Sequence, residues 1–215
     1  QPQMEGDVVV VESVKVAEEV PDAGEGEWPL EPFCSDMCHD IFDAQWEVRH
    51  GAAMALRDAL KHHSESAGRS AGDCEDQQNR DNAEWLEECT VRLLCVLALD
   101  RFGDYVSDQV VAPVRETASQ ALGVVLRTLP MVCLPSVLAC LTKLTQHEWW
   151  EVRHGGMLGL KYLTAVRTEA VQPSLVSVLS LISAGIQDDD DDVRAVAAEA
   201  ALPLVVIMVG DAASA

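Results

Sequence analysis

Apolar residues recur at helical spacing through most of the chain after its first 27 residues. In the first such stretch Phe33, Met37 and Ile41 are four positions apart, which places them on one face of a helix. Several later stretches open with proline at a first-turn position, as at Pro113. The pattern predicts an all-α chain whose helices pair as four hairpins. The predicted ranges are 29–42, 46–61, 82–100, 113–128, 130–146, 150–168, 173–185 and 191–210.

One string of six residues, Trp-Glu-Val-Arg-His-Gly, occurs twice, at 46–51 and at 150–155. Looser copies begin with a Val-Arg pair at 114–115 and at 193–194. Successive arginines of these copies are 66, 38 and 41 positions apart (115 − 49, 153 − 115, 194 − 153). Periods near ~40 residues are typical of two-helix HEAT or armadillo-like units. The sequence therefore predicts an α-solenoid of about four HEAT-type hairpins over residues 28–210, with a repeat ladder formed by Arg49, Arg115, Arg153 and Arg194.

In a HEAT-type hairpin the valine of the Val-Arg pair packs in the core, and the arginine reaches the acidic residue of its own turn or of the next repeat. Asp43 and Asp188 stand six residues before the first and last ladder arginines, as this pattern requires. The other two units have Gln109 and His147 at that place, which leaves their ladder contacts open. Each glycine of the repeated helix costs up to ~1 kcal/mol of helix propensity. We therefore expect another helix to cross close to Gly51, Gly155, Gly156 and Gly159.

The remaining segments lack this periodicity. Residues 1–27 are acidic and contain glycine and proline, which predicts a disordered linker. Residues 64–81 are polar and lie between the first two hairpins, so we expect an exposed, flexible loop there. This loop also accounts for the long first interval between repeat arginines. Pro203 is expected to kink or divide the last helix, and residues 211–215 form a tail.

Composition narrows the function. The chain has 15 Lys and Arg against 36 Asp and Glu, a net charge of −21. This balance argues against a direct grip on a phosphate backbone. It suits either a basic protein partner or an acidic surface that serves solubility alone. No apolar run approaches the ~18–20 residues of a membrane span, so we expect no membrane contact. Seven scattered cysteines with mainly apolar neighbours indicate reduced thiols in helix cores and an intracellular protein.

No motif indicates an enzyme or a bound cofactor. The phosphate-binding, dinucleotide-binding and nucleophile-elbow glycine motifs do not occur. Cys34, Cys38 and His39 have no second Cys or His pair at zinc-finger spacing, so we expect no metal site. His50 and His154 recur with the repeat, which favours a shared structural role over catalysis.

Several strings resemble one family more specifically than HEAT units in general: the two copies of Trp-Glu-Val-Arg-His-Gly and residues 97–117, 159–167 and 190–200. Over about residues 28–204 the chain resembles the TATA-binding-protein-associated factor of the Swi/Snf ATPase group, the modifier-of-transcription family. That resemblance implies a nuclear protein whose N-terminal HEAT array grips TATA-binding protein. A C-terminal motor, with ATP and Mg, would then strip that protein from promoter DNA. This chain would be an internal, non-enzymatic piece of the array that reaches DNA only through the full-length protein.

In such arrays partner contacts tend to come from the turns between paired helices. The tryptophans of these turns are either exposed hot spots or buried staples. The acidic run at 188–192 either binds a cation or a basic partner, or stabilises a helix N-terminus. A HEAT adaptor for another partner, as in transport or phosphatase scaffolds, is the alternative function. The candidate contact residues are Asp43, Gln45, Trp46, Asp108, Gln109, His147, Trp149, Trp150, Asp188 and Asp190.

Overall fold

The computed structural model describes residues 26–100, 105–106, 109–110 and 113–212. The linker predicted over residues 1–27 therefore lies almost wholly outside the described residues. The elements are α1 (Glu31–Asp40), α2 (Trp46–His63), α3 (Glu75–Leu99), β1 (Tyr105–Val106), β2 (Gln109–Val110), α4 (Pro113–Thr128), α5 (Leu134–Thr145), α6 (Trp150–Val166), α7 (Thr168–Val171), a 3-10 turn (Gln172–Ser174), α8 (Leu175–Ile186) and α9 (Asp191–Ala212).

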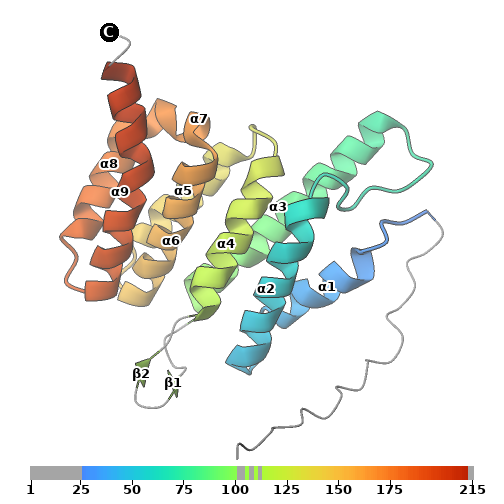
Figure 1. Cartoon of the computed structure of the whole chain (residues 1–215), viewed down its shortest axis with the longest axis horizontal. Coiled ribbons are helices and arrows are strands. Elements are labelled where there is room, and N and C mark those ends of the chain that lie inside the picture. The colour runs from blue at the N-terminus through green and yellow to red at the C-terminus, as the bar shows by residue number, and fades with distance from the viewer. Residues whose placement is uncertain (1–25, 101–104, 107–108, 111–112, 213–215) are drawn as a thin grey trace, which may run out of the picture.

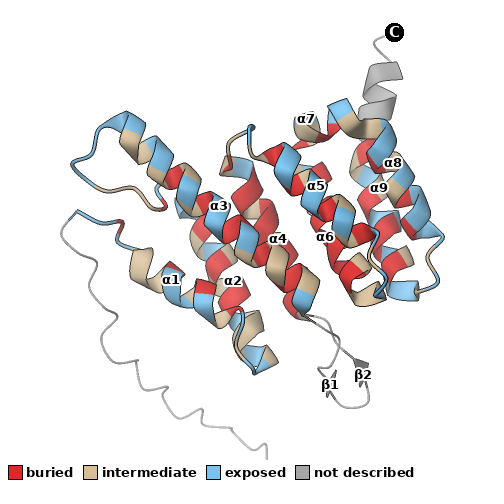
Figure 2. Ribbon diagram, turned by 180° about the vertical axis from the view of Figure 1, so that it is seen from behind, coloured by how far each residue is buried: buried red, intermediate tan, exposed pale blue. Residues whose placement is uncertain are grey.

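The helices pair in chain order as α1 with α2, α3 with α4, α5 with α6 and α8 with α9. The second helices of these hairpins stack side by side in the order α2, α4, α6 and α9, while α3, α5 and α8 form the other layer (Figure 1). Buried side chains gather on the faces where the layers meet (Figure 2). The predicted all-α solenoid of four hairpins is confirmed. Between α3 and α4 the described backbone adds one short antiparallel pair, β1 with β2.

Two predicted boundaries are wrong. The first seven residues of α3, from Glu75 to Asp81, belong to the segment predicted as loop. They carry no apolar periodicity, but two acidic residues in the first turn and a 2.6 Å hydrogen bond from Gln77 Nε2 to Asp81 Oδ1 stabilise the helix there. At the other end, α9 continues through Pro203 without dividing and includes residues 211–212 of the predicted tail.

The remaining loop, residues 64–74, is tied to the helices on both sides. The amide Nδ2 of Asn82 donates to the carbonyls of Ser64 and Ala67, each at 2.8 Å. Ala67 is fully buried, and the hydroxyl of Ser64 lies 2.8 Å from that of Thr128. These contacts hold part of the described loop against α3 and α4.

Three of the four repeat glycines lie where helices cross closely. A Cβ on Gly155 would lie 2.0 Å from the carbonyl oxygen of Leu97, and one on Gly156 would lie 2.6 Å from the backbone nitrogen of Thr145. At Gly159 the nearest atom would be a side-chain methyl of α5 at 2.3 Å. Around Gly51 nothing lies within 4 Å, so the expected crossing is wrong there.

Residues 168–186 form the one stretch, among those described, that is long and apolar enough to cross a membrane, with a mean hydropathy of 1.4. In the fold this stretch is broken by the 3-10 turn, where Pro173 interrupts the helix, and α8 packs against α9.

The burial of the cysteines differs in part from the prediction that they lie in helix cores. Cys34, Cys38 and Cys89 are buried, but Cys74 and Cys140 are exposed.

Candidate functional site

The turns that close the hairpins lie along one edge of the solenoid, at the bottom of Figure 1. We call this the turn edge and define it by residues 41–45, 99–100, 146–149 and 186–190. The backbone of β1 and β2 lies at the same edge (Figure 1). Of the predicted contact residues there, Asp108 lies outside the described residues, and Gln109 is described only by its backbone in β2.

Arg49 and Arg153 make matching contacts at this edge. Arg49 donates from Nε to Asp100 Oδ1 (2.9 Å), and Arg153 donates from Nε and Nη2 to the two carboxylate oxygens of Asp188 (2.6 and 2.7 Å). Asp100 and Asp188 each follow the first helix of a hairpin, so each bond joins one repeat to the next. Each Nη1 also donates to two turn carbonyls, five and six residues earlier in the chain.

Arg115 and Arg194 occupy the same repeat position with different surroundings. Arg115 is fully buried and donates to the carbonyls of Asp100 (2.6 Å) and Glu151 (2.7 Å). It thereby joins the end of α3 and the start of α6 to its own helix α4. Arg194 donates from Nη1 to the carbonyl of Asp188, six residues earlier, and pairs with the carboxylate of Asp191.

As expected, Arg49 and Arg153 each reach an acidic residue of the next repeat, but the partner within the arginine's own turn differs from the prediction. The residue six positions before Arg49, Arg153 or Arg194 offers its backbone carbonyl to the arginine, not its side chain. His147 therefore provides the same backbone acceptor as an aspartate would at this position. The carboxylate that Arg49 uses is that of Asp100, which is not among the residues predicted from the sequence. Its distance of 51 positions along the chain hides the pairing.

The side chains at that position close the turn instead. Oxygen or nitrogen atoms of Asp43, His147 and Asp188 accept the backbone N–H two residues later, at 2.7, 3.1 and 3.0 Å. Asp190 Oδ1 accepts the N–H groups of residues 192 and 193 and caps α9. This favours a helix-terminus role for the acidic run at 188–192 over a cation site.

Charge pairing and burial shift the pKa values of three groups along the ladder. The hydrogen bond from Arg153 holds the pKa of Asp188 below its ordinary value, and the same bond raises the pKa of Arg153. His154 is buried beside Arg115, whose Nη1 lies 3.3 Å from its Nδ1. Burial first, and then the guanidinium charge, lower the pKa of His154 to about 4. His154 is thus a neutral core residue at pH 7. Its twin His50 contacts the hydroxyl of Thr117 instead.

The pKa of His154 predicts a loss of stability in mild acid. As the pH falls from about 6.5 to about 4, the unfolded chain takes up the proton of this histidine first, so unfolding becomes more favourable. The loss is at most about 3 kcal/mol from this group. Urea unfolding at pH 7 and pH 4.5 measures it. The variant His154→Asn keeps an acceptor for Arg115 and should lose less stability between the two pH values; an equal loss in both proteins would contradict the assignment.

Large exposed apolar side chains occur in every turn of this edge. Phe42 and Leu99 are 44% and 67% exposed, and Trp149 and Ile186 are 47% and 45% exposed. Phe42 and Leu99 border a hollow of about 380 Å³ between the first two hairpins. Phe42, Leu99 and Ile186 were not predicted as contact residues. A helical stripe of apolar residues in the sequence does not show where a helix extends beyond its neighbour and becomes exposed.

The three predicted tryptophans separate into two groups. Trp46 and Trp150 begin α2 and α6, are half-buried and pack against the core. Trp149 is exposed, with its ring centroid 5.4 Å from that of His147. Gln45 is also exposed, whereas the carboxylate of Asp188 is engaged by Arg153. Trp149 is therefore the predicted residue best placed to meet a partner.

The three residues considered above as possible metal ligands differ in their degree of burial. Cys34 and Cys38 are buried in α1, while the side chain of His39 is 91% exposed. Within the part of the chain that the structure describes, no group of three His, Cys, Asp or Glu residues is placed to hold a metal ion.

No family model matches the chain. Curated relatives match it over about four fifths of its length. It is 52% identical over 179 residues to TATA-binding protein-associated factor 172 of Homo sapiens (83% of this chain, 10% of that protein). It is 45% identical over 187 residues to TATA-binding protein-associated factor mot1 of Aspergillus fumigatus, and 35% identical over 188 residues to MOT1 of Saccharomyces cerevisiae (each 82% of this chain, 10% of that protein). The chain thus spans about a tenth of the length of these relatives.

Similar solved structures include an engineered protein (TM-score 0.45, 14% identity, 80% of this chain and 62% of that one). A designed armadillo repeat protein in complex with the peptide (KR)4 aligns with a TM-score of 0.43 and 16% identity, over 81% of this chain and 64% of that one. At these scores the overlap adds nothing to the description of the fold.

Proposed function

We propose, from the premise that this chain is a homologue of one segment of the TATA-binding protein-associated factors, that its four hairpins form a scaffold that binds TATA-binding protein. The resemblance inferred from the sequence is confirmed by these relatives, at 35–52% identity. In our proposal the chain is one part of a longer nuclear protein with a Swi/Snf-type motor. That motor would use ATP to remove TATA-binding protein from promoter DNA, and so regulate transcription.

The row of exposed apolar side chains along the turn edge carries the proposal. Water-exposed aromatic and large aliphatic residues mark protein interaction sites when they gather on one surface. Here one such residue occurs in each turn, at Phe42, Leu99, Trp149 and Ile186. Because the ladder arginines bind the turn backbones and hold the repeats in register, the row has a fixed spacing along the solenoid.

Charge at the same edge supports a basic partner surface. Glu148 and Asp189 are exposed beside Trp149 and Ile186 in the turns of the last two hairpins. The whole chain carries a net charge of −21. Complementary charge at the rim of an interface raises the association rate, while the buried aromatic anchors supply most of the affinity.

Removal of the anchors should weaken binding. Purified TATA-binding protein is titrated into the full chain, and the dissociation constant is measured by calorimetry. Phe42→Ala and Trp149→Ala are each expected to raise the dissociation constant at least about tenfold, because truncated interface anchors typically cost about 2 kcal/mol or more.

Val132→Ala is the matched control, since Val132 is 83% exposed but lies between α4 and α5, away from the turn edge. It should bind like the unchanged chain. If a folded chain fails to bind TATA-binding protein at micromolar concentration, the proposed partner is wrong and the adaptor function for another protein takes its place. If the protein binds but the turn variants do not weaken binding, the partner stands and the turn edge is the wrong surface.

A further inference from the structure

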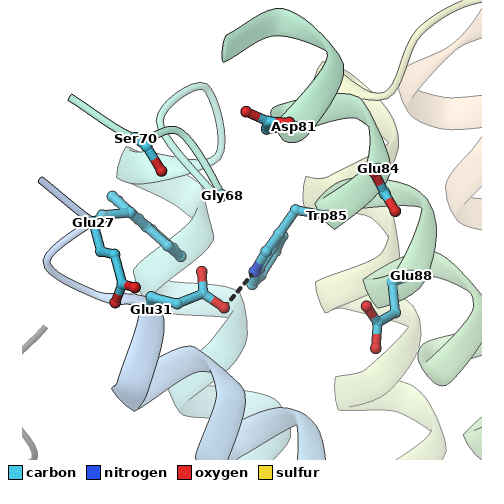
Figure 3. A pocket seen from close by; sticks show the side chains of 9 residues that line it. Glu27, Glu31, Gly68, Ser70, Asp81, Glu84, Trp85 and Glu88 are labelled. Atoms are coloured by element: carbon cyan, nitrogen blue, oxygen red, sulfur yellow. Dashed lines mark hydrogen bonds between the residues drawn. The ribbon is translucent and has the colours of Figure 1, made fainter. Parts of the chain in front are cut away.

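A cavity of about 340 Å³ lies between the start of α1, the loop after α2 and the middle of α3 (Figure 3). It is at the opposite end of α1 from the turn edge. The interface proposed above does not include it, and the ladder arginines do not line it. Binding at this cavity would therefore be independent of the partner proposed for the turns.

Two tryptophans form one wall of the cavity. The rings of Trp28 and Trp85 meet edge to face, with centroids 5.4 Å apart and an interplanar angle of 80°. Trp85 Nε1 donates to Glu31 Oε1 at 3.2 Å (Figure 3). This bond orients the side chains of Trp85 and Glu31. An indole face that borders a cavity attracts a cation within about 6 Å of the ring.

The wall is built in advance of any ligand. Gly68 has φ of +72°, and a Cβ at this position would lie 2.7 Å from Cβ of Trp85, so only glycine lets the loop pass this close to α3. Ala71 N donates to the carbonyl of Gly26, which ties the loop to the chain just before α1. The fold thus orders these residues before a ligand binds, so little conformational entropy is lost there on binding.

Carboxylates surround this aromatic wall. Glu27 and Glu31 approach from one side, and Asp81, Glu84 and Glu88 project from α3 on the other (Figure 3). Among the described residues no lysine or arginine lines the cavity.

One of these carboxylates is incompletely satisfied. Oε2 of Glu31 is buried and accepts no hydrogen bond from the part of the chain that the structure describes. A buried carboxylate oxygen without a donor is costly, and a cation held nearby in the cavity offsets part of that cost.

We propose that this cavity binds the cationic end of an arginine or lysine side chain in a basic segment of a protein partner. The cation would stack on the tryptophan wall, where its charge would offset that of the buried Glu31 carboxylate. Glu84, which lines the cavity from α3, would balance the charge from the other side. Aromatic contact and carboxylate contact then act on the same group, which neither a neutral nor an acidic side chain could exploit.

The test uses the full chain, labelled with 15N, and the blocked peptide Gly-Ser-Arg-Ser-Gly. The indole N–H signals of Trp28 and Trp85 should shift saturably with this peptide or with its lysine counterpart. The peptide with citrulline in place of arginine has the same shape without charge and should bind at least about tenfold more weakly. The double variant Glu31→Gln with Glu84→Gln should weaken arginine or lysine binding by a similar factor.

Glu148→Gln with Asp189→Asn is the control, because it removes two exposed charges at the turn edge and should leave peptide binding unchanged. Equal binding of the citrulline peptide, or no saturable shift with either cationic peptide, would overturn the proposal. The first 27 residues contain a single cationic side chain, Lys15. If Lys15→Ala alone moves the two indole signals, the chain's own N-terminal segment fills the cavity, and a partner segment is the wrong occupant.

Discussion

Replacing Arg115 with alanine is expected to lower the free energy of unfolding by about 3–5 kcal/mol, the usual cost of breaking a buried charge network. Its guanidinium is fully buried and donates to the carbonyls of Asp100 and Glu151. The variant removes this donor from both carbonyls, in an interior that water does not reach. Urea unfolding followed by circular dichroism measures the change.

Arg194→Ala provides the comparison within the same ladder. Arg194 is paired with Asp191, but its side chain is 38% exposed, and exposed ion pairs contribute about 0–1 kcal/mol. The two variants should therefore differ by several-fold in their effect on stability. Similar small losses of stability in both variants would show that the hydrogen bonds of Arg115 contribute little to holding the second hairpin against its neighbours.

The second large effect concerns two glycines at the same position of the repeated string. Gly155→Ala is expected to cost about 3 kcal/mol or more, because the new methyl group would lie 2.0 Å from the carbonyl oxygen of Leu97 and α3 must move. Gly51→Ala is expected to gain up to about 1 kcal/mol, because alanine is the better helix former and nothing lies within 4 Å. Parallel urea titrations of the two variants determine both signs.

Opposite signs are expected although both glycines follow the same Trp-Glu-Val-Arg-His string. A destabilising Gly51→Ala would mean that a further element covers α2 on that face. A neutral Gly155→Ala would mean that α6 and α3 are farther apart than the structure places them.

Much of the fold can be predicted from the sequence, because each hairpin repeats the same local pattern. Helical spacing and the Val-Arg period predict the four hairpins and their order. The period does not contain the neighbourhood of each copy. Gly155 lies on α6, between α4 and α9 and against α3 and α5, whereas Gly51 lies on α2 in the first of the described hairpins. The same six residues therefore meet different surroundings.

The position of the turn edge can be predicted from the sequence, but not which of its side chains are exposed. Phe42 continues the apolar stripe of the first helix in the sequence, but in the fold it lies just beyond the end of α1 and is exposed. Asp188 was predicted both as an acid of the ladder and as a contact residue, and its carboxylate is engaged by Arg153. The exposure of Phe42 could not be predicted, because exposure at a helix end depends on the length of the neighbouring helix, which local spacing does not encode.

The contact between an arginine and the carbonyl six residues earlier constrains the turns in a particular way. A carbonyl is present whatever the side chain, so a substitution at Asp43 or His147 leaves the acceptor in place. A one-residue insertion or deletion between the two positions would instead move the acceptor out of reach and break the link between the arginine and its turn. Turn length is therefore fixed by this contact, while the contact itself places no demand on the side chain six residues before the arginine. An array built in this way can acquire a new binding surface by point substitution without losing its register.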